Sequence, residues 1–138
     1  MSIEDIRGRV SSLCADLGMT PSAIPWSFER TPTGVIDQAF RIESEQGQVV
    51  GWFDYVEERT DLVRVWVARK MTTDAQTMYD RLLSDVSSLR AAVIRDGLSD
   101  GGDYFVPDGG SAWDIQAEAG REFAVLRLTL PVNYEIRV

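Results

Sequence analysis

The sequence predicts an α+β fold: an antiparallel sheet with two helices packed on it, in the order α-β-β-β-α-β-β. Two segments carry apolar residues at steps of three and four, which is typical of amphipathic helices. Runs of β-branched and aromatic residues lie between these segments, and the last stretch alternates strictly between apolar and polar side chains. No repeat or linker divides the 138 residues. We therefore expect a single domain over 1–138.

The first helix is predicted over residues 3–17, where one face is apolar. Ser2 stands at the N-cap position, and Asp5 follows three residues later, as in a capping box. Gly18 suits the left-handed position just beyond a helix end. Cys14, the only cysteine, falls within this helical pattern, so we interpret it as a small core residue.

The second helix is predicted from an apolar stripe that runs from Tyr79 to Val93. Thr73 and Gln76 have the spacing of a capping box at its start. Gly97 stands where a glycine that ends a helix is expected. The opposite face is polar, so this helix should pack one face against a sheet.

Three consecutive antiparallel strands are expected between the helices. The first passes through Phe40, the second covers 49–56 and the third covers 62–69, where valines occupy alternate positions. The Glu-Gln-Gly-Gln step over 45–48 predicts the hairpin turn between the first two strands. The polar stretch 57–61 predicts the break before the third.

The C-terminal segment has the most regular pattern of the chain. Apolar residues alternate with polar ones from Leu126 to Val138, with one exception at Pro131, which predicts a long strand with one buried face. Tyr134 lies on that face. Pro131 cannot donate to a ladder, so the strand should be an edge or bulged there. Residues 112–117 suggest its hairpin partner.

Composition argues against several functions. The chain has 22 acidic and 14 basic residues, a net charge of -8 that disfavours a groove for nucleic-acid phosphates. It has no histidine, so the usual triads, histidine acid–base chemistry and ordinary zinc sites are not expected. No apolar run approaches the ~20 residues of a membrane helix, and the acidic start does not resemble a secretory signal. We expect a soluble cytoplasmic protein that is not an enzyme and needs no cofactor or metal.

Two acidic segments are candidate sites. Asp54, Glu57, Glu58 and Asp61 could form a carboxylate pair of a hydrolase or a Mg²⁺ site, but carboxylates near a strand turn are usually solvated. The glycine- and aspartate-rich segment 99–111 lacks the spacing of a calcium-binding EF-hand loop. We interpret it as a loop that orders against a partner.

Three stretches carry a resemblance to a known family. They are the alternating strand RVWVARK with the helix TTDAQTMYDRLLSDVSSLRAAVIRDG, the excursion SDGGDYFVPDGG, and the closing strand GREFAVLRLTLPVNYEIRV. In this order they resemble the tail terminator family of long-tailed phages, often called minor tail or tail completion proteins. The resemblance covers residues 49–138.

The resemblance implies a homo-oligomeric ring, a hexamer, that caps the last ring of tail tube protein, stops tail growth and later meets the head-tail connector protein. It places the protein in the neck region of the virion tail after assembly in the host cytoplasm. DNA would cross the lumen without specific binding, and the negative charge is compatible with that passage.

The candidate contacts for such assembly lie in three segments. They are the expected hairpin tip at Gln46 and Gly47, the glycine-rich loop with Tyr104, Phe105 and Asp108, and the terminal strand with Pro131 and Tyr134. Plain solvent-exposed loops remain the alternative interpretation of the first two. For the whole protein, the alternative is a small acidic immunity or chaperone-type protein that binds a single partner.

Overall fold

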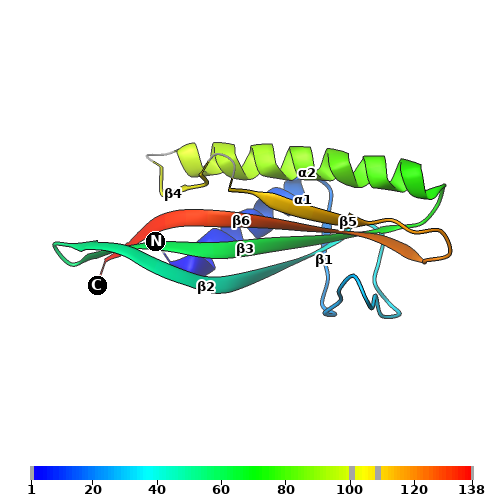
Figure 1. Ribbon diagram of the computed structural model, residues 1–138, viewed down its shortest axis with the longest axis horizontal. Coiled ribbons are helices and arrows are strands. Elements are labelled where there is room, and N and C mark those ends of the chain that lie inside the picture. Colours follow the sequence, from blue (N-terminus) through cyan, green and yellow to red (C-terminus); the bar gives the residue numbers. More distant parts are fainter. Residues whose placement is uncertain (1, 100–101, 108–109, 138) are drawn as a thin grey trace.

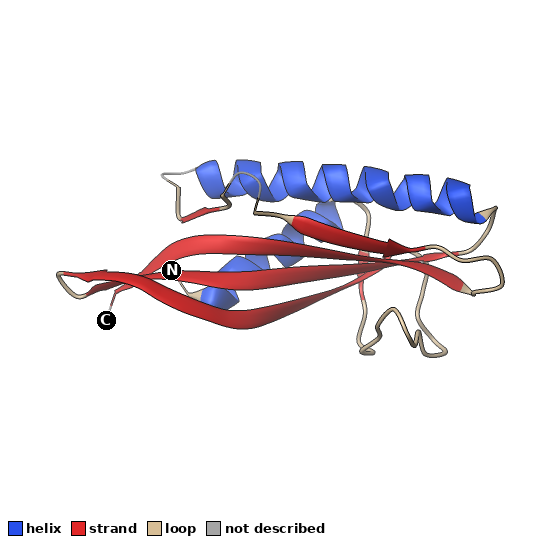
Figure 2. Cartoon of the chain, viewed as in Figure 1, coloured by secondary structure: helices blue, strands red, loops and turns tan. Residues whose placement is uncertain are grey.

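The computed structural model describes residues 2–99, 102–107 and 110–137. Within these residues the elements are α1 Ile3–Asp16, β1 Thr20–Pro21, β2 Ala39–Phe53, β3 Val56–Lys70, α2 Ala75–Leu98, β4 Tyr104–Phe105, β5 Ala112–Gln116 and β6 Phe123–Arg137. The predicted α+β class is confirmed, because two helices pack on a mostly antiparallel sheet (Figures 1 and 2).

Three strands of 15 residues each, β2, β3 and β6, form the body of the sheet. The strand order is β1-β2-β3-β6-β4, with β5 also paired to β6. Only the short β1 runs parallel to its neighbour, β2. Figure 1 shows the long strands side by side, with α2 along one side of the sheet and α1 crossing it obliquely.

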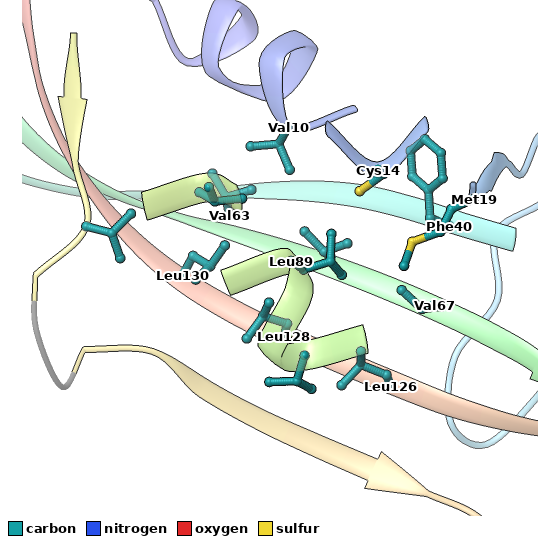
Figure 3. Packing of buried hydrophobic residues seen from close by; sticks show 14 of the residues in the cluster. Val10, Cys14, Met19, Phe40, Val63, Val67, Leu89, Leu126, Leu128 and Leu130 are labelled. Atoms are coloured by element: carbon teal, nitrogen blue, oxygen red, sulfur yellow. The ribbon is translucent and has the colours of Figure 1, made fainter. Parts of the chain in front are cut away.

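Both helices cover the same face of the sheet. Val63, Val65 and Val67 alternate along β3 and are fully buried, as are Leu126, Leu128 and Leu130 on β6. They pack against the apolar stripes of α1 and α2 to form the main core (Figure 3). Burial of each such side chain contributes about 1.5 to 3 kcal/mol.

A smaller core lies on the other face, under the segment between β1 and β2. Trp26 and Val35 from this segment pack against Trp66 of β3. The two indole rings meet edge to face, with centroids 6.1 Å apart. The second core covers only one end of the sheet, near the start of β2.

The ends of α1 agree with the sequence analysis. Ser2 Oγ accepts the N–H of Asp5 at 3.2 Å, and the Asp5 carboxylate accepts the N–H of Ser2 at 3.0 Å. Gly18 follows the C-cap residue with a φ of 87°, in the left-handed region. Both predicted end signals are therefore confirmed.

The predicted ends of α2 were wrong. Asp74 is the N-cap, and its carboxylate accepts the N–H of Thr77 at 2.8 Å, so Thr73 and Gln76 do not form a capping box. Gly97 lies inside the helix. A Cβ on Gly97 would approach the carbonyl oxygen of Tyr104 to 2.7 Å, so glycine is needed there for the close passage of β4.

The predicted turn over 45–48 was also wrong. β2 continues through this stretch, and the hairpin turns at Asp54 and Tyr55, which have φ values of 42° and 66°. Gly47 marks a bulge, where the pairing shifts between Glu45 and Gln48. A Cβ at this position would lie 1.7 Å from the carbonyl oxygen of Thr60. The polar stretch 57–61 accordingly lies within β3 and does not interrupt it.

The predicted long terminal strand is confirmed as β6, and the predicted edge at Pro131 is local. On one side β6 pairs with β3 along its whole length. On the other side β5 pairs with residues 125–129 and β4 with 133–134, which leaves Pro131 opposite neither strand. Pro131, which has no N–H to donate, therefore lies at the gap between these two strands.

None of the helices formed by residues 2–99, 102–107 and 110–137 is both long and apolar enough to span a membrane.

The bulge yields a test of the β2–β3 register. We expect Gly47→Ala to lower the free energy of unfolding by about 3 kcal/mol or more, because the new methyl group overlaps backbone that cannot rotate away. Gly8→Ala is the matched control, since nothing lies within 4 Å of a Cβ there and alanine favours a helix by about 1 kcal/mol. Urea denaturation measures both. Equal effects of the two substitutions would contradict the bulge.

Candidate functional site

The most prominent surface feature is the end of the β2–β3 hairpin, which extends past the helices at the left of Figure 1. We call residues 49–61 the β2–β3 arm. Two residues with positive φ, Asp54 and Tyr55, close it with a tight turn of the type that matches strand twist. Two register shifts in β2, one before Gln48 and one before Gly51, increase its local twist.

The arm carries a concentration of exposed apolar side chains. Their exposed fractions are 42% for Val49, 60% for Val50, 63% for Trp52, 52% for Phe53 and 83% for Tyr55. Large apolar residues are individually common on protein surfaces, but a contiguous group on a strand is typical of a contact site.

The apolar groups lie on both faces of the arm. Val49 pairs with Arg59 and Trp52 pairs with Glu57, and paired residues share a face. By alternation along β3, that is the face covered by the helices farther along the sheet. Phe53 pairs with Val56 and lies on the opposite face. A partner bound at the edge of the arm would therefore contact apolar side chains on both faces.

A buried carboxylate holds the base of the arm. Asp61 is only 4% exposed, and it accepts the N–H of Gly47 at 2.8 Å and the hydroxyl of Tyr134. Arg59 joins it at 3.4 Å and pairs with Glu57 at 2.6 Å. These bonds connect the bulge of β2, the strand β3 and the strand β6 at the point where the core ends.

The environment shifts two pKa values in this group. Burial alone would raise the pKa of Asp61, but the hydrogen bonds from Tyr134, Gly47 and Arg59 together lower it below its ordinary value. Burial and the neighbouring Asp61 carboxylate raise the pKa of Tyr134. Asp61 is thus a charged acceptor and Tyr134 a neutral donor.

These contacts correct the interpretation of the acidic cluster as solvated side chains. Asp61 is buried, and Glu57 is engaged by Arg59. Glu58 lies on the opposite face from Glu57, and Asp54 is in the turn, so the four carboxylates do not converge. Among residues 2–99, 102–107 and 110–137, no group of three or more acidic or cysteine side chains is placed to hold a metal.

A cleft of about 920 Å³ adjoins the arm. Val50 and Arg59 of the arm line one part of it, and Phe105 of β4 and Ile136 of β6 line another. The start of α1 contributes Ser2. The cleft therefore lies between the apolar surface of the arm and the side of the sheet formed by β6 and β4.

β4 is held firmly beside this cleft. The hydroxyl of Tyr104 lies 2.7 Å from Asp96 and 3.0 Å from the carbonyl oxygen of Val93. Arg9 of α1 pairs with Asp96 and with Asp103, each at 2.9 Å. Burial and the neighbouring Asp96 raise the pKa of Tyr104. Both helices thus position the short strand.

The candidate contacts predicted from sequence fall into different environments. Gln46 and Gly47 lie in the bulge and not at a hairpin tip. Tyr104 and Tyr134 are 1% and 5% exposed and pair with each other across β4 and β6, so Tyr134 has the buried position expected for it and Tyr104 is not an exposed side chain. Phe105 is 49% exposed.

Two further candidates remain. Pro131 is half-buried and lies in the gap between β4 and β5, where a Cβ on Gly110 would approach its ring to 2.7 Å. Asp108 lies outside the described residues. The cleft thus brings Tyr104, Phe105 and Tyr134 together, whereas Gln46 and Pro131 do not line it.

The apolar residues of the arm were not identified as candidates from sequence. The signal was the run Val-Val-Gly-Trp-Phe, whose apolar residues do not alternate with polar ones as they would in a half-buried strand. Its consecutive apolar positions indicate a strand with apolar side chains on both faces.

The sequence matches no protein-family model and no curated protein.

The first test of the site concerns Asp61. We expect Asp61→Ala to lower the free energy of unfolding by about 2 kcal/mol or more, because it leaves the buried Tyr134 hydroxyl and the Gly47 N–H without their acceptor. Tyr134→Phe removes one donor only and should cost about 1 kcal/mol. Urea denaturation gives both values. An Asp61→Ala protein as stable as the wild type would show that this cluster does not hold the arm.

A second test uses pH. Because the folded-state pKa of Asp61 lies below its ordinary value of 3.8, its charged form contributes stability that is fully present above that pH. The contribution is lost as pH falls through the folded-state pKa. The stability advantage of the wild type over Asp61→Asn should therefore stay constant from about pH 6 to about pH 4 and narrow as the pH falls further, to about pH 2. Denaturation of both proteins across this range measures the difference, and a constant difference would contradict the assignment.

Proposed function

We propose that this protein is a structural subunit of a phage tail. In this proposal it assembles as a ring on the end of the tail tube, ends tail growth and forms the joint to the head connector in the neck of the virion. The observation that carries the proposal is the β2–β3 arm, with five large apolar side chains between 42% and 83% exposed.

The physical argument is that such an arm needs a partner. Each apolar side chain of this size gains about 1.5 to 3 kcal/mol when it is fully buried, and an uncovered strand edge with apolar side chains promotes pairing with other chains. A ring supplies a repeated partner, since each subunit places one surface against a different surface of its neighbour. The arm thus supports an assembling subunit.

The resemblance over residues 49–138 supports the more specific assignment to a tail terminator. The net charge of -8 is compatible with a lumen through which DNA passes, because a negative lining repels phosphates. The tail tube protein and the head connector are the partners that this function requires.

The test is assembly on tail tubes. Purified protein mixed with tubes of tail tube protein should appear as a ring at the tube end in electron micrographs, and sedimentation should detect subunits bound to tubes. A protein that stays monomeric and leaves tube ends bare would overturn the proposal. A monomer that instead binds one basic toxin or effector would support the immunity or chaperone alternative.

A double variant in the arm and a control variant outside it test whether the arm makes the contacts. Val50→Lys with Trp52→Lys should reduce assembly and tube capping at least about tenfold, because two apolar contacts are replaced by charges that must be desolvated. The matched control is Ile36→Lys, a residue 50% exposed in the segment between β1 and β2. Circular dichroism should show that all variants keep the fold. Normal capping by the arm variant would contradict a role for the arm.

A further inference from the structure

The sheet has an unpaired edge along most of β2. β1 pairs only with Ala39 and Phe40, so within the described residues no strand pairs with the outer side of β2 from 41 to 53. The exposed side chains of Val50 and Trp52 border this edge. We call it the β2 edge.

The opposite side of the same sheet has a second unpaired edge. β4 and β5 pair with β6, and no other described strand pairs with either of them. Phe105 on β4 and Trp113 on β5 are 49% and 43% exposed. We call it the β4–β5 edge.

The two edges run along the same part of the sheet. Through β3, residues 41–53 of β2 lie across from residues 127–137 of β6. β4 and β5 lie along residues 125–134 of β6. Figure 1 shows the same arrangement, with β2 on one side of the β3–β6 pair and β5 on the other. The edges therefore face opposite ways and overlap along residues 127–134 of β6, where the β4–β5 edge consists of the two-residue β4 and part of the five-residue β5.

A second copy of this chain is the occupant that fits both edges at once. Unpaired backbone N–H and C=O groups on one strand edge can bond to those on another strand edge. Each copy of the chain carries both a β2 edge and a β4–β5 edge. Pairing of two β2 edges about a two-fold axis would leave Phe105 and Trp113 uncovered. Pairing of unlike edges covers both aromatic residues and repeats from copy to copy, and it closes a ring when the rotation permits.

We propose that the sheet continues from subunit to subunit, with the β2 edge of one copy paired to the β4–β5 edge of the next. This inference rests on the ring function proposed above and specifies its interface. The strand twist between neighbouring subunits supplies the rotation that a ring needs.

Cysteine cross-linking tests this interface. Gln48 on β2 and Ala112 on β5 are both exposed and lie on the face opposite the helices, since Gln48 pairs with Thr60 and Ala112 pairs with Thr129. A short flexible bismaleimide should link the double variant Gln48→Cys, Ala112→Cys into a ladder of multimers. Cys14 should not compete, because burial raises the pKa of its thiol to about 12.

The single variants distinguish the possible geometries. A mixture of Gln48→Cys and Ala112→Cys should give cross-linked dimers only, and neither single variant alone should cross-link. Dimers from Gln48→Cys alone would indicate two-fold pairing of β2 edges and would overturn the inference. Rings on tubes without any cross-link would overturn this interface and leave the proposed function standing. Bare tubes together with a monomeric protein in sedimentation would overturn both.

Discussion

The pairing of β3 with β6 is the interaction on which the rest of the structure depends. Its register is unbroken from Val56 opposite Arg137 to Lys70 opposite Phe123. The helices pack on one face of this pair and the tryptophan cluster packs on the other. β2 pairs with one side of it, β4 and β5 pair with the other, and β1 adds to β2. A slip of one residue would turn the leucines of β6 from the core to the opposite face, so the apolar alternation fixes the register. The cost of closing the long connection between the two strands is offset by α2, which fills it and packs on the core.

The pairing of β2 with β3 is less regular than the pairing of β3 with β6. β2 pairs with β3 along its whole length but contains two register shifts, one at the base of the arm and one within it. There the helix-facing side of β3 changes from Val63 to Asp61, Arg59 and Glu57. At those positions charge pairing and hydrogen bonds replace apolar packing as the means of holding the strands together. The arm is therefore held at its base by polar contacts and is apolar toward its tip.

The features that could be predicted from sequence are those determined by near neighbours in the chain. The alternation from Leu126 onward predicted β6, and the spacing of Ser2 and Asp5 predicted the start of α1, because each depends on one local period or one local hydrogen bond. Gly47 misled the prediction, since a glycine in a polar stretch is typical of a turn. Its actual constraint, the carbonyl oxygen of Thr60, comes from the neighbouring strand and leaves no trace in the local pattern.

The candidate site was less predictable than the fold for the same reason. The hydroxyl of Tyr104 is held by Asp96 of α2. The hydroxyl of Tyr134 is held by Asp61, which precedes it by 73 residues in the chain. The turn at Asp54 and Tyr55 contains neither glycine nor asparagine, so its sequence does not indicate a hairpin. With the turn predicted over 45–48, the apolar run is expected to begin a separate strand, whereas it continues β2 on the exposed arm.

The tryptophans give the protein two separate optical reporters. Trp26 and Trp66 are 3% and 7% exposed in the smaller core. Trp52 and Trp113 are solvent-exposed and lie on opposite sides of the sheet. An indole emits at shorter wavelength when it leaves water, so the buried pair responds to unfolding and the exposed pair responds to whatever covers the edges. The intrinsic fluorescence of the unmodified chain can therefore follow loss of the fold and contact with another molecule as two distinct changes, without any added label.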